Sequence, residues 1–237
     1  TNFNRALIHR EDRIYATIEA TAVNPDTPLR LTFDRPVQAG GSGRIRILRA
    51  SDNTVVETLD LGAAPTRLVG TNPTPYRFLP VMASGNTVTI HPRAATLAYN
   101  QSYYVTMESG AILDATGASF TGIADAGAWR FTTRNAGPLP GTASVTVAAD
   151  GSGDFSTVQG AIDFVPAGNT ARVLITVQRG TYAEINYIGS GKPFITIRGE
   201  DRAGTIIAYP NNNNFNSGNN RAMFSVDAND FTLETIT

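Results

Sequence analysis

Two pairs of aspartates lie close enough together in the sequence to suggest a catalytic or metal-binding site. Asp150 and Asp154 flank Gly-Ser-Gly, and acidic side chains that alternate with glycine are typical of calcium loops. This stretch lacks the distal bidentate glutamate of such loops, so we favour a turn in which Asp154 or Ser156 caps a following helix. Asp227 and Asp230 flank Ala-Asn, where Asp and Asn side chains bond the local backbone of a turn. We favour a turn over a catalytic pair there as well.

Other metal chemistry is poorly provided for. The chain has no cysteine, and His9 and His91 are its two imidazoles, which excludes a zinc enzyme. His91 precedes Pro92 at the end of a strand pattern, and we expect it to be an exposed turn residue rather than a ligand. We therefore predict no metal site and no cofactor.

Charge and composition narrow the class of protein. Nineteen basic and twenty acidic side chains leave a formal net charge of -1, so no long-range field attracts nucleic acid or an anionic membrane. No run approaches the roughly eighteen apolar residues that membrane insertion needs, and the polar start is not a signal peptide, so we expect any export signal to have been removed. The 22 glycines and 13 prolines favour short strands joined by many turns, hence an all-β protein.

The first half shows the period-two pattern of an antiparallel β-sandwich. Short alternating or β-branched runs are separated by Gly, Pro, Asn and Asp, which supply turn conformations. The expected strands are residues 29–33, 44–48, 87–90, 103–107 and 129–133. The stretches 26–33, 97–105 and 129–133 together resemble the bacterial Ig-like domain of the surface-layer type, over roughly residues 15–134.

A change of pattern follows this region. Residues 135–142 carry two prolines and two glycines without periodicity, as interdomain linkers do. We therefore predict a β-sandwich domain over 1–134, a linker over 135–142 and a second domain over 143–237.

The second domain combines one helical segment with strands at short intervals. Apolar residues at 155, 158, 161, 162 and 165 have the spacing of an amphipathic helix, which Pro166 and Gly168 end. The strands expected after it are residues 172–177, 185–188, 194–197, 205–208, 222–226 and 231–236. Strands that recur every 20 to 35 residues without further helices indicate coils that bury their apolar faces by stacking. The pattern predicts the first coils of a parallel β-helix with one capping helix.

Ordered motifs in this domain resemble pectin methylesterases. Residues 145–163 resemble the start of that family, and Gly180-Thr181-Tyr182-Ala183-Glu184 matches its first signature, Gly-x-Tyr-x-Glu. Residues 195–200 and 205–207 match the next two rungs, and 222–237 resemble the rung before the catalytic one. The resemblance implies a right-handed β-helix and a carboxylic ester hydrolase that splits galacturonate methyl esters of pectin into pectate and methanol without a cofactor.

The same resemblance places the chemistry elsewhere. In the family, a carboxylate nucleophile, a second carboxylate as acid, amide donors and an arginine lie in later signatures, none of which is present here. We therefore assign no catalytic residue to this chain and expect it to be inactive alone, as the incomplete N-terminal portion of the enzyme. Met223 stands where many members have a substrate-contacting threonine, which changes the expected contacts with pectin.

Three further assignments concern binding. For Tyr182 and Glu184 we favour a structural role, a buried hydroxyl and carboxylate that organise the coil, over substrate contact. The Asn-rich stretch 211–220 lacks periodicity and is expected to be a projecting loop, either flexible or in contact with sugar hydroxyls. With Met223, its Asn216 and Asn219 are our candidates for a substrate cleft.

Two functions are compatible with this sequence. The first is a secreted or cell-surface bacterial pectin methylesterase with an Ig-like spacer. The alternative is a non-catalytic polysaccharide-binding or surface-adhesion protein, whereas the Gly-Thr-Tyr-Ala-Glu signature argues against a lyase or galacturonase. Pectin or a related polysaccharide is the expected ligand, without nucleic acid. Because an open β-helix end exposes strand edges, we also expect a missing fragment or partner to cover it.

Overall fold

The computed structural model describes residues 5–9, 13–14, 18–64, 66–69 and 76–237, with the side chains described from residue 19 onward except those of Arg67 and Asn219. Its contacts divide the chain into two compact units. One unit contains residues 2–67 and 79–136, and the other contains 68–78 and 137–237 together with Thr1. The short segment 68–78 therefore lies within the sequence of the first unit but packs with the second.

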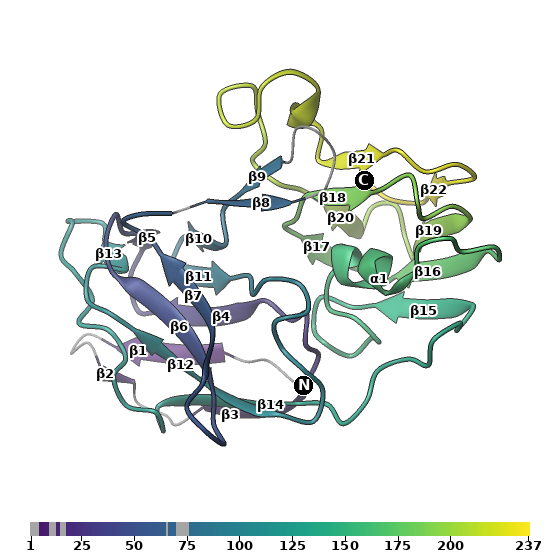
Figure 1. Cartoon of the computed structure of the whole chain (residues 1–237). Helices are drawn as coiled ribbons and strands as arrows, with labels where there is room; N and C mark the ends of the chain where they lie inside the picture. The colour runs from purple at the N-terminus through teal and green to yellow at the C-terminus, as the bar shows by residue number, and fades with distance from the viewer. Residues whose placement is uncertain (1–4, 10–12, 15–17, 65, 70–75) are drawn as a thin grey trace. The chain divides into compact units, whose positions relative to one another are not determined.

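The first unit contains two five-stranded sheets (Figure 1). The spatial order of one sheet is β10 (Val81–Ser84), β11 (Thr87–Ile90), β4 (Leu29–Phe33), β1 (Arg5–His9) and β2 (Arg13–Ile14). The order of the other is β3 (Ile18–Val23), β14 (Trp129–Thr133), β12 (Ser102–Met107), β6 (Arg44–Arg49) and β7 (Val55–Asp60). A two-stranded ribbon pairs β5 (Val37–Ala39) with β13 (Ile112–Asp114). The Ig-like sandwich is confirmed.

The sandwich is not purely antiparallel, and that part of the expectation is wrong. Strand β1 pairs with β4 in parallel, and β14 pairs with β3 in parallel. Strand β3, which lies in the opposite sheet, separates β1 from β4 along the chain. Between β1 and β4 the chain crosses to the other sheet and back. This crossing allows the two strands to run in the same direction, which a direct hairpin cannot do. Alternation within a strand predicts which face is buried but not the direction of its neighbour.

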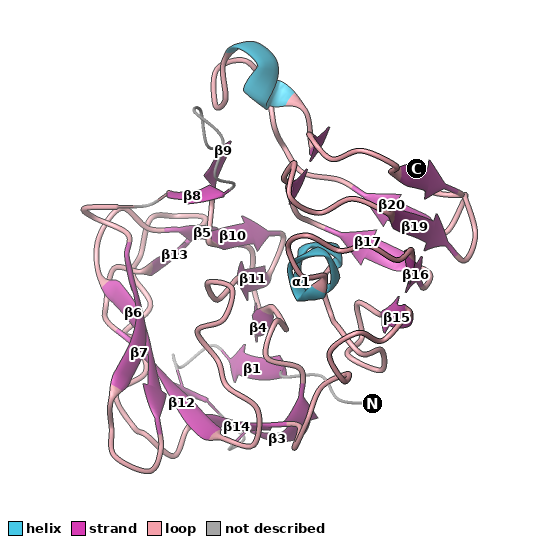
Figure 2. Ribbon diagram, turned by 45° about the vertical axis from the view of Figure 1, so that its right-hand side comes forward, coloured by secondary structure: helices cyan, strands magenta, loops and turns pink. Residues whose placement is uncertain are grey.

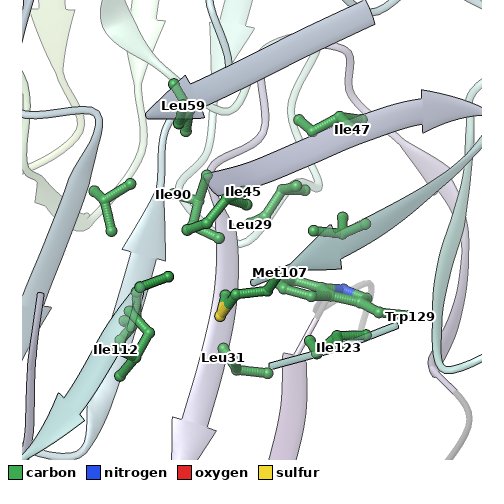
Figure 3. Close-up of a cluster of buried hydrophobic side chains, with 14 of the residues drawn as sticks. Leu29, Leu31, Ile45, Ile47, Leu59, Ile90, Met107, Ile112, Ile123 and Trp129 are labelled. Atoms are coloured by element: carbon green, nitrogen blue, oxygen red, sulfur yellow. The ribbon is translucent and has the colours of Figure 1, made fainter. Parts of the chain in front are cut away.

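One apolar core fills the sandwich, with side chains from both sheets (Figure 3). Trp129 on β14 is fully buried, as are Leu29 and Leu31 on β4 and Ile45 and Ile47 on β6. Each fully buried side chain of this size stabilises the fold by about 1.5–3 kcal/mol relative to an exposed one. The period-two pattern of the sequence thus corresponds to a real inward face.

His91 differs from its expected position. It follows β11 and is buried, and its backbone N–H donates to the carbonyl of Pro80 at 2.7 Å. The expectation of an exposed turn residue was wrong, because a residue at a strand end can lie under a neighbouring segment that the local sequence does not reveal. The side chain of His9 lies outside the described part of the chain.

Parallel strands build the second unit in stacked coils (Figure 1). One ladder has the order β15 (Ser144–Val147), β16 (Val173–Val177), β19 (Ile195–Gly199) and β22 (Thr232–Glu234). Two further ladders pair β17 (Gly180–Tyr182) with β20 (Thr205–Ile207), and β18 (Asn186–Ile188) with β21 (Phe224–Val226). These are the coils of a parallel β-helix, as predicted.

The register of the parallel strands places apolar residues opposite one another in successive coils. Val145 lies opposite Ile175, Ile175 opposite Ile197, and Ile197 opposite Leu233. Val145, Ile175 and Ile197 are fully buried. Gly199 is required in its row because a Cβ there would stand 2.1 Å from the carbonyl oxygen of Thr235. In this row the coils therefore pack through apolar residues stacked on apolar residues.

The predicted helix exists but begins later than expected. Helix α1 spans Val158–Phe164, drawn in cyan in Figure 2, and packs against β15, β16 and β18. Its N-cap is Thr157, whose side chain accepts from the N–H of Gly160 at 3.0 Å. Asp154 and Ser156, our expected caps, lie outside that position; the carboxylate of Asp154 instead accepts from the backbone and hydroxyl of Thr146. In the part of the chain that the structure describes, no helix could span a membrane.

Segment 68–78 contains a small two-stranded sheet, β8 (Arg67–Val69) with β9 (Tyr76–Phe78). The expected linker, residues 135–142, has no regular secondary structure and includes the exposed Leu139. Thr142 closes a turn there by donating to the carbonyl of Leu139. The exact boundaries of the two domains stay a prediction.

Candidate functional site

Tyr182, the tyrosine of the Gly-x-Tyr-x-Glu signature, lies inside the coil. It ends β17 and is buried, and its hydroxyl donates to the carbonyl of Gln178 at 2.9 Å. Burial raises the pKa of Tyr182 to about 12. A phenol that stays protonated and bonded to the main chain organises the coil and is not poised to act as an acid or base.

Glu184 joins the signature to the helix. The segment between β17 and β18 carries this buried carboxylate, whose two oxygens accept from the N–H groups of Val158 and Gln159 at 2.9 and 2.8 Å. Those are the first two residues of α1, whose amides have no partner within the helix. A negative charge is also favoured beside the positive end of a helix. Glu184 therefore acts as a second cap, supplied from 26 residues away along the chain.

Asn186 completes this network. It is fully buried in β18, and its amide nitrogen donates to Glu184 at 2.9 Å. The side-chain amide of Gln159 spans the same region, since its oxygen accepts from the N–H of Tyr187 at 2.8 Å. The bonds of Val158, Gln159 and Tyr187 join the helix to the coil, and the bond from Asn186 orients the carboxylate of Glu184.

Steric crowding explains why residue 180 of the signature is glycine. A Cβ at this position would lie 3.1 Å from the Cβ of Ala149 and 3.5 Å from the ring of Tyr182. Glycine therefore allows the Tyr182 ring to lie close to the start of its own strand. Tyr182 and Glu184 are both buried and bonded to backbone groups. A structural role for the signature, rather than substrate contact, stays a prediction.

The carboxylates of Asp150, Asp154 and Asp227 each accept hydrogen bonds. Asp150 accepts from the N–H and hydroxyl of Ser152, which hold the pKa of its carboxyl below the usual range. Asp227 accepts from the hydroxyl of Tyr187 at 3.0 Å, and Asp230 has a positive φ of 55°, as expected in a turn. Among the described residues, no group of three or more potential ligands could hold a metal ion.

Met223 immediately precedes β21, in the ladder formed by β18 and β21, and is exposed. Its sulfur accepts from the N–H of Tyr209 at 3.0 Å, and its carbonyl accepts from the N–H of Asn186 at 2.8 Å. Of the candidate cleft residues, Met223 offers a thioether to the surface one coil away from the buried Glu184 network.

Asn216 has a different environment. It is buried, and its side chain pairs with the backbone of Arg77, accepting from the N–H at 2.7 Å and donating to the carbonyl at 3.0 Å. Its amide nitrogen also donates to the side-chain oxygen of Asn211 at 2.8 Å. The backbone of Asn219 lies in a short 3-10 helix, Gly218–Arg221, and its side chain lies outside the described part of the chain. That these residues line a sugar cleft stays a prediction.

Other asparagines fold the loop on itself. Asn211 donates to the carbonyls of Asn220 and Ala222, at 3.0 and 3.1 Å, which closes the base of the loop. Asn212 accepts from the N–H groups of Asn214 and Phe215. The Asn-rich composition is therefore explained by side-chain to backbone bonds within the loop.

Aromatic rings join strand β9 to the coil. Phe78 stacks on Tyr209 with ring centroids 5.1 Å apart and planes 21° from parallel, and Tyr209 lies 6.4 Å from Phe215. Tyr76 approaches Tyr187 at 6.5 Å. These contacts were not predicted from the sequence, although the alternation Tyr76-Arg77-Phe78 is the signal for a strand with one aromatic face.

Comparison with known families agrees with the two halves. The family model described as Bacterial Ig-like domain matches residues 14–133, about half of the chain, and the Pectinesterase model matches residues 144–237. The chain therefore belongs to the bacterial Ig-like domain family, and its second half matches the Pectinesterase family model.

Individual relatives match part of the chain. The chain is 39% identical over 88 residues to probable pectinesterase 67 of Arabidopsis thaliana, which covers 37% of this chain and 25% of that protein. It is 43% identical over 70 residues to pectinesterase 31 of the same plant, with 30% and 22% covered. The chain thus spans about a quarter of the length of the curated relatives it matches.

Solved structures with similarity are also pectin methylesterases. One, a mutant in complex with a hexasaccharide, is 26% identical with a TM-score of 0.33 and covers 38% of this chain and 28% of its own. The enzyme from carrot is 23% identical with a TM-score of 0.33 and covers 43% and 40%.

Proposed function

We propose that this chain is part of a bacterial pectin methylesterase that hydrolyses galacturonate methyl esters of pectin to pectate and methanol. The observation that carries the proposal is the Pectinesterase match over residues 144–237, together with the Gly-Thr-Tyr-Ala-Glu coil that it contains. In this coil, Tyr182 and Glu184 are bonded to Gln178 and to the start of α1.

The segment has a scaffold role in this proposal. The carboxylate nucleophile, the acid and the orienting arginine of the family belong to signatures outside residues 144–237. The stacked coils and the Glu184 network hold the strands on which such groups would stand, and Met223 faces the substrate at the edge of the coil. A rigid scaffold of this kind is what positions catalytic side chains within the tolerance that rate enhancement needs.

Methanol release tests the activity. The complete natural protein, incubated with highly methyl-esterified pectin, is expected to release methanol and titratable carboxylate in equal amounts. Unesterified polygalacturonate is the matched control and should release neither. Absence of methanol from properly folded protein would overturn the proposal.

A non-catalytic polysaccharide-binding or surface-adhesion protein is the second candidate, and the bacterial Ig-like match over residues 14–133 favours it. It predicts retention on immobilised pectin with no methanol release. Either function places the protein outside the cell or on its surface, which we propose as its location. Detection of the protein in culture medium or on intact cells would test that placement.

A further inference from the structure

We propose that strand β9, although it lies within the sequence of the bacterial Ig-like domain, positions the polysaccharide-facing edge of the pectinesterase coil. Residues 68–78 belong to the same compact unit as residues 137–237. The pectinesterase match begins only at residue 144, so this strand is an addition from outside that domain. The inference rests on the proposed function, because it treats the Met223 edge as a pectin-binding edge.

The first contact is a two-point pairing between Asn216 and the main chain of Arg77. The side-chain amide both accepts and donates, as a neighbouring strand would, at 2.7 and 3.0 Å. Asn216 is only 4% exposed, so loss of its buried amide would remove both bonds that connect the loop to strand β9. This pairing holds the Asn-rich loop, residues 211–220, to strand β9 at Asn216.

The second contact connects strand β9 to Met223. Phe78 and Tyr209 are both buried and stack at 5.1 Å. The N–H of Tyr209 in turn donates to the sulfur of Met223 at 3.0 Å. A ring that holds Tyr209 in place therefore also orients the exposed thioether, so Phe78 is a positioning residue that acts through Tyr209.

These contacts make the Ig-like region more than a spacer. Ordering a loop before the substrate arrives removes an entropy cost from binding, so a pre-ordered edge lowers KM without a direct part in the chemical step. Strand β9 would thus set affinity for the methyl-esterified chain and leave bond cleavage to other residues.

The test uses the complete natural protein with Asn216→Ala and Phe78→Ala. Two matched controls change residues of the same segments at exposed positions: Asn214→Ala, whose turn contact is made by its backbone N–H, and Leu68→Ala. Hydrogen exchange of residues 205–223 is measured by mass spectrometry, and KM and kcat are measured on methyl-esterified pectin.

We expect exchange of the loop amides to rise about tenfold in both variants, and KM to rise several-fold at unchanged kcat. The controls should match wild type in both measurements. Unchanged exchange in Asn216→Ala and Phe78→Ala would overturn the positioning role. Increased exchange with an unchanged KM would overturn its link to substrate.

The two proposals fail in different ways. If wild-type protein releases no methanol, the proposed esterase function fails, while the exchange measurement still decides whether β9 orders the loop. If methanol is released and neither variant differs from the controls, the esterase proposal stands and the inference about β9 is wrong.

Discussion

Two buried glutamates show how differently the two units use polar groups. Glu57 of the sandwich accepts from the N–H of Arg93 at 2.7 Å and so connects a loop to the edge of a mainly apolar core. Glu184 of the coil accepts from two helix amides and the side chain of Asn186. The sandwich is stabilised mainly by apolar side chains that interdigitate, whereas the coil needs a buried charge to join its helix to its strands.

A substitution that leaves a cavity in the sandwich core should lower the free energy of unfolding the most. Leu31→Ala removes a fully buried side chain from the middle of β4 and should lower the free energy of unfolding by about 4 kcal/mol. Trp129, the single tryptophan, is buried in the same core and reports this transition by fluorescence in urea. Val55→Ala, at an exposed position of β7, is the control. An equal shift in the transition of the coil, followed by hydrogen exchange, would show that the two units unfold as one.

Loss of the bonds between Glu184 and α1 should give the second largest decrease in the free energy of unfolding. Glu184→Ala leaves two amides of α1 and the side chain of Asn186 without this acceptor, and should cost about 3 kcal/mol in the coil. Glu57→Ala should cost only about 1 kcal/mol in the sandwich, since it removes one bond to a loop. Hydrogen exchange of each unit measures both. Equal costs for the two glutamates would contradict the contrast drawn between them.

Tyr182→Phe should have a smaller effect that depends on pH. At neutral pH it removes the hydroxyl bond to Gln178 and should cost about 1 kcal/mol. The pKa of Tyr182 is raised to about 12 in the fold, whereas an unfolded tyrosine ionises near pH 10. The folded state therefore holds the extra proton between those values, so stability falls as pH rises from about 10 to about 12.

The variant should lose this contribution to the alkaline decline, because phenylalanine has no proton to release. Urea unfolding followed by circular dichroism at pH 9 and pH 11 measures the difference. A decline as steep as that of wild type would show that the Tyr182 hydroxyl is not the group responsible.

The smallest effect is expected at the surface of the coil. Arg198 and Glu234 lie opposite each other on β19 and β22, with Nε and Oε1 2.6 Å apart, and both side chains are substantially exposed. A double-mutant cycle with Arg198→Gln and Glu234→Gln should give a coupling of roughly 0.5 kcal/mol, which salt should weaken further. Coupling as large as the Glu184 effect would contradict the view that burial, not charge alone, makes the difference.

Local periodicity predicted much of the fold. Strands β4, β11 and β14 have the bounds expected from alternation, and the helix and the coil strands lie where their apolar spacing indicated. These patterns succeed because one face of each element meets the core and selects apolar residues at a fixed interval. The helix start was misplaced by three residues, since Thr157, Ser156 and Asp154 are all residue types that can cap.

The candidate site was less accessible to such reasoning. The signature Gly180, Tyr182 and Glu184 was found from its resemblance to a family, but the partners of Glu184 lie 25 and 26 residues earlier in the chain. Asn216 was singled out because it lies in an Asn-rich stretch, and its place in a sugar cleft stays a prediction. Its side-chain bonds to the backbone of Arg77, 139 residues away, were not expected. No local pattern encodes such a pairing.

By itself, then, the sequence determined the two classes of domain, the strand periods and the family of the second half, because each depends on residues close together along the chain. Tertiary structure alone decided that β1 and β4 run in parallel, that Glu184 caps α1, and that β9 packs with the coil whose sequence begins some 65 residues later. The physical reason is that a buried hydrogen-bonding group is satisfied by whichever partner the completed fold brings near it, however distant that partner is in sequence.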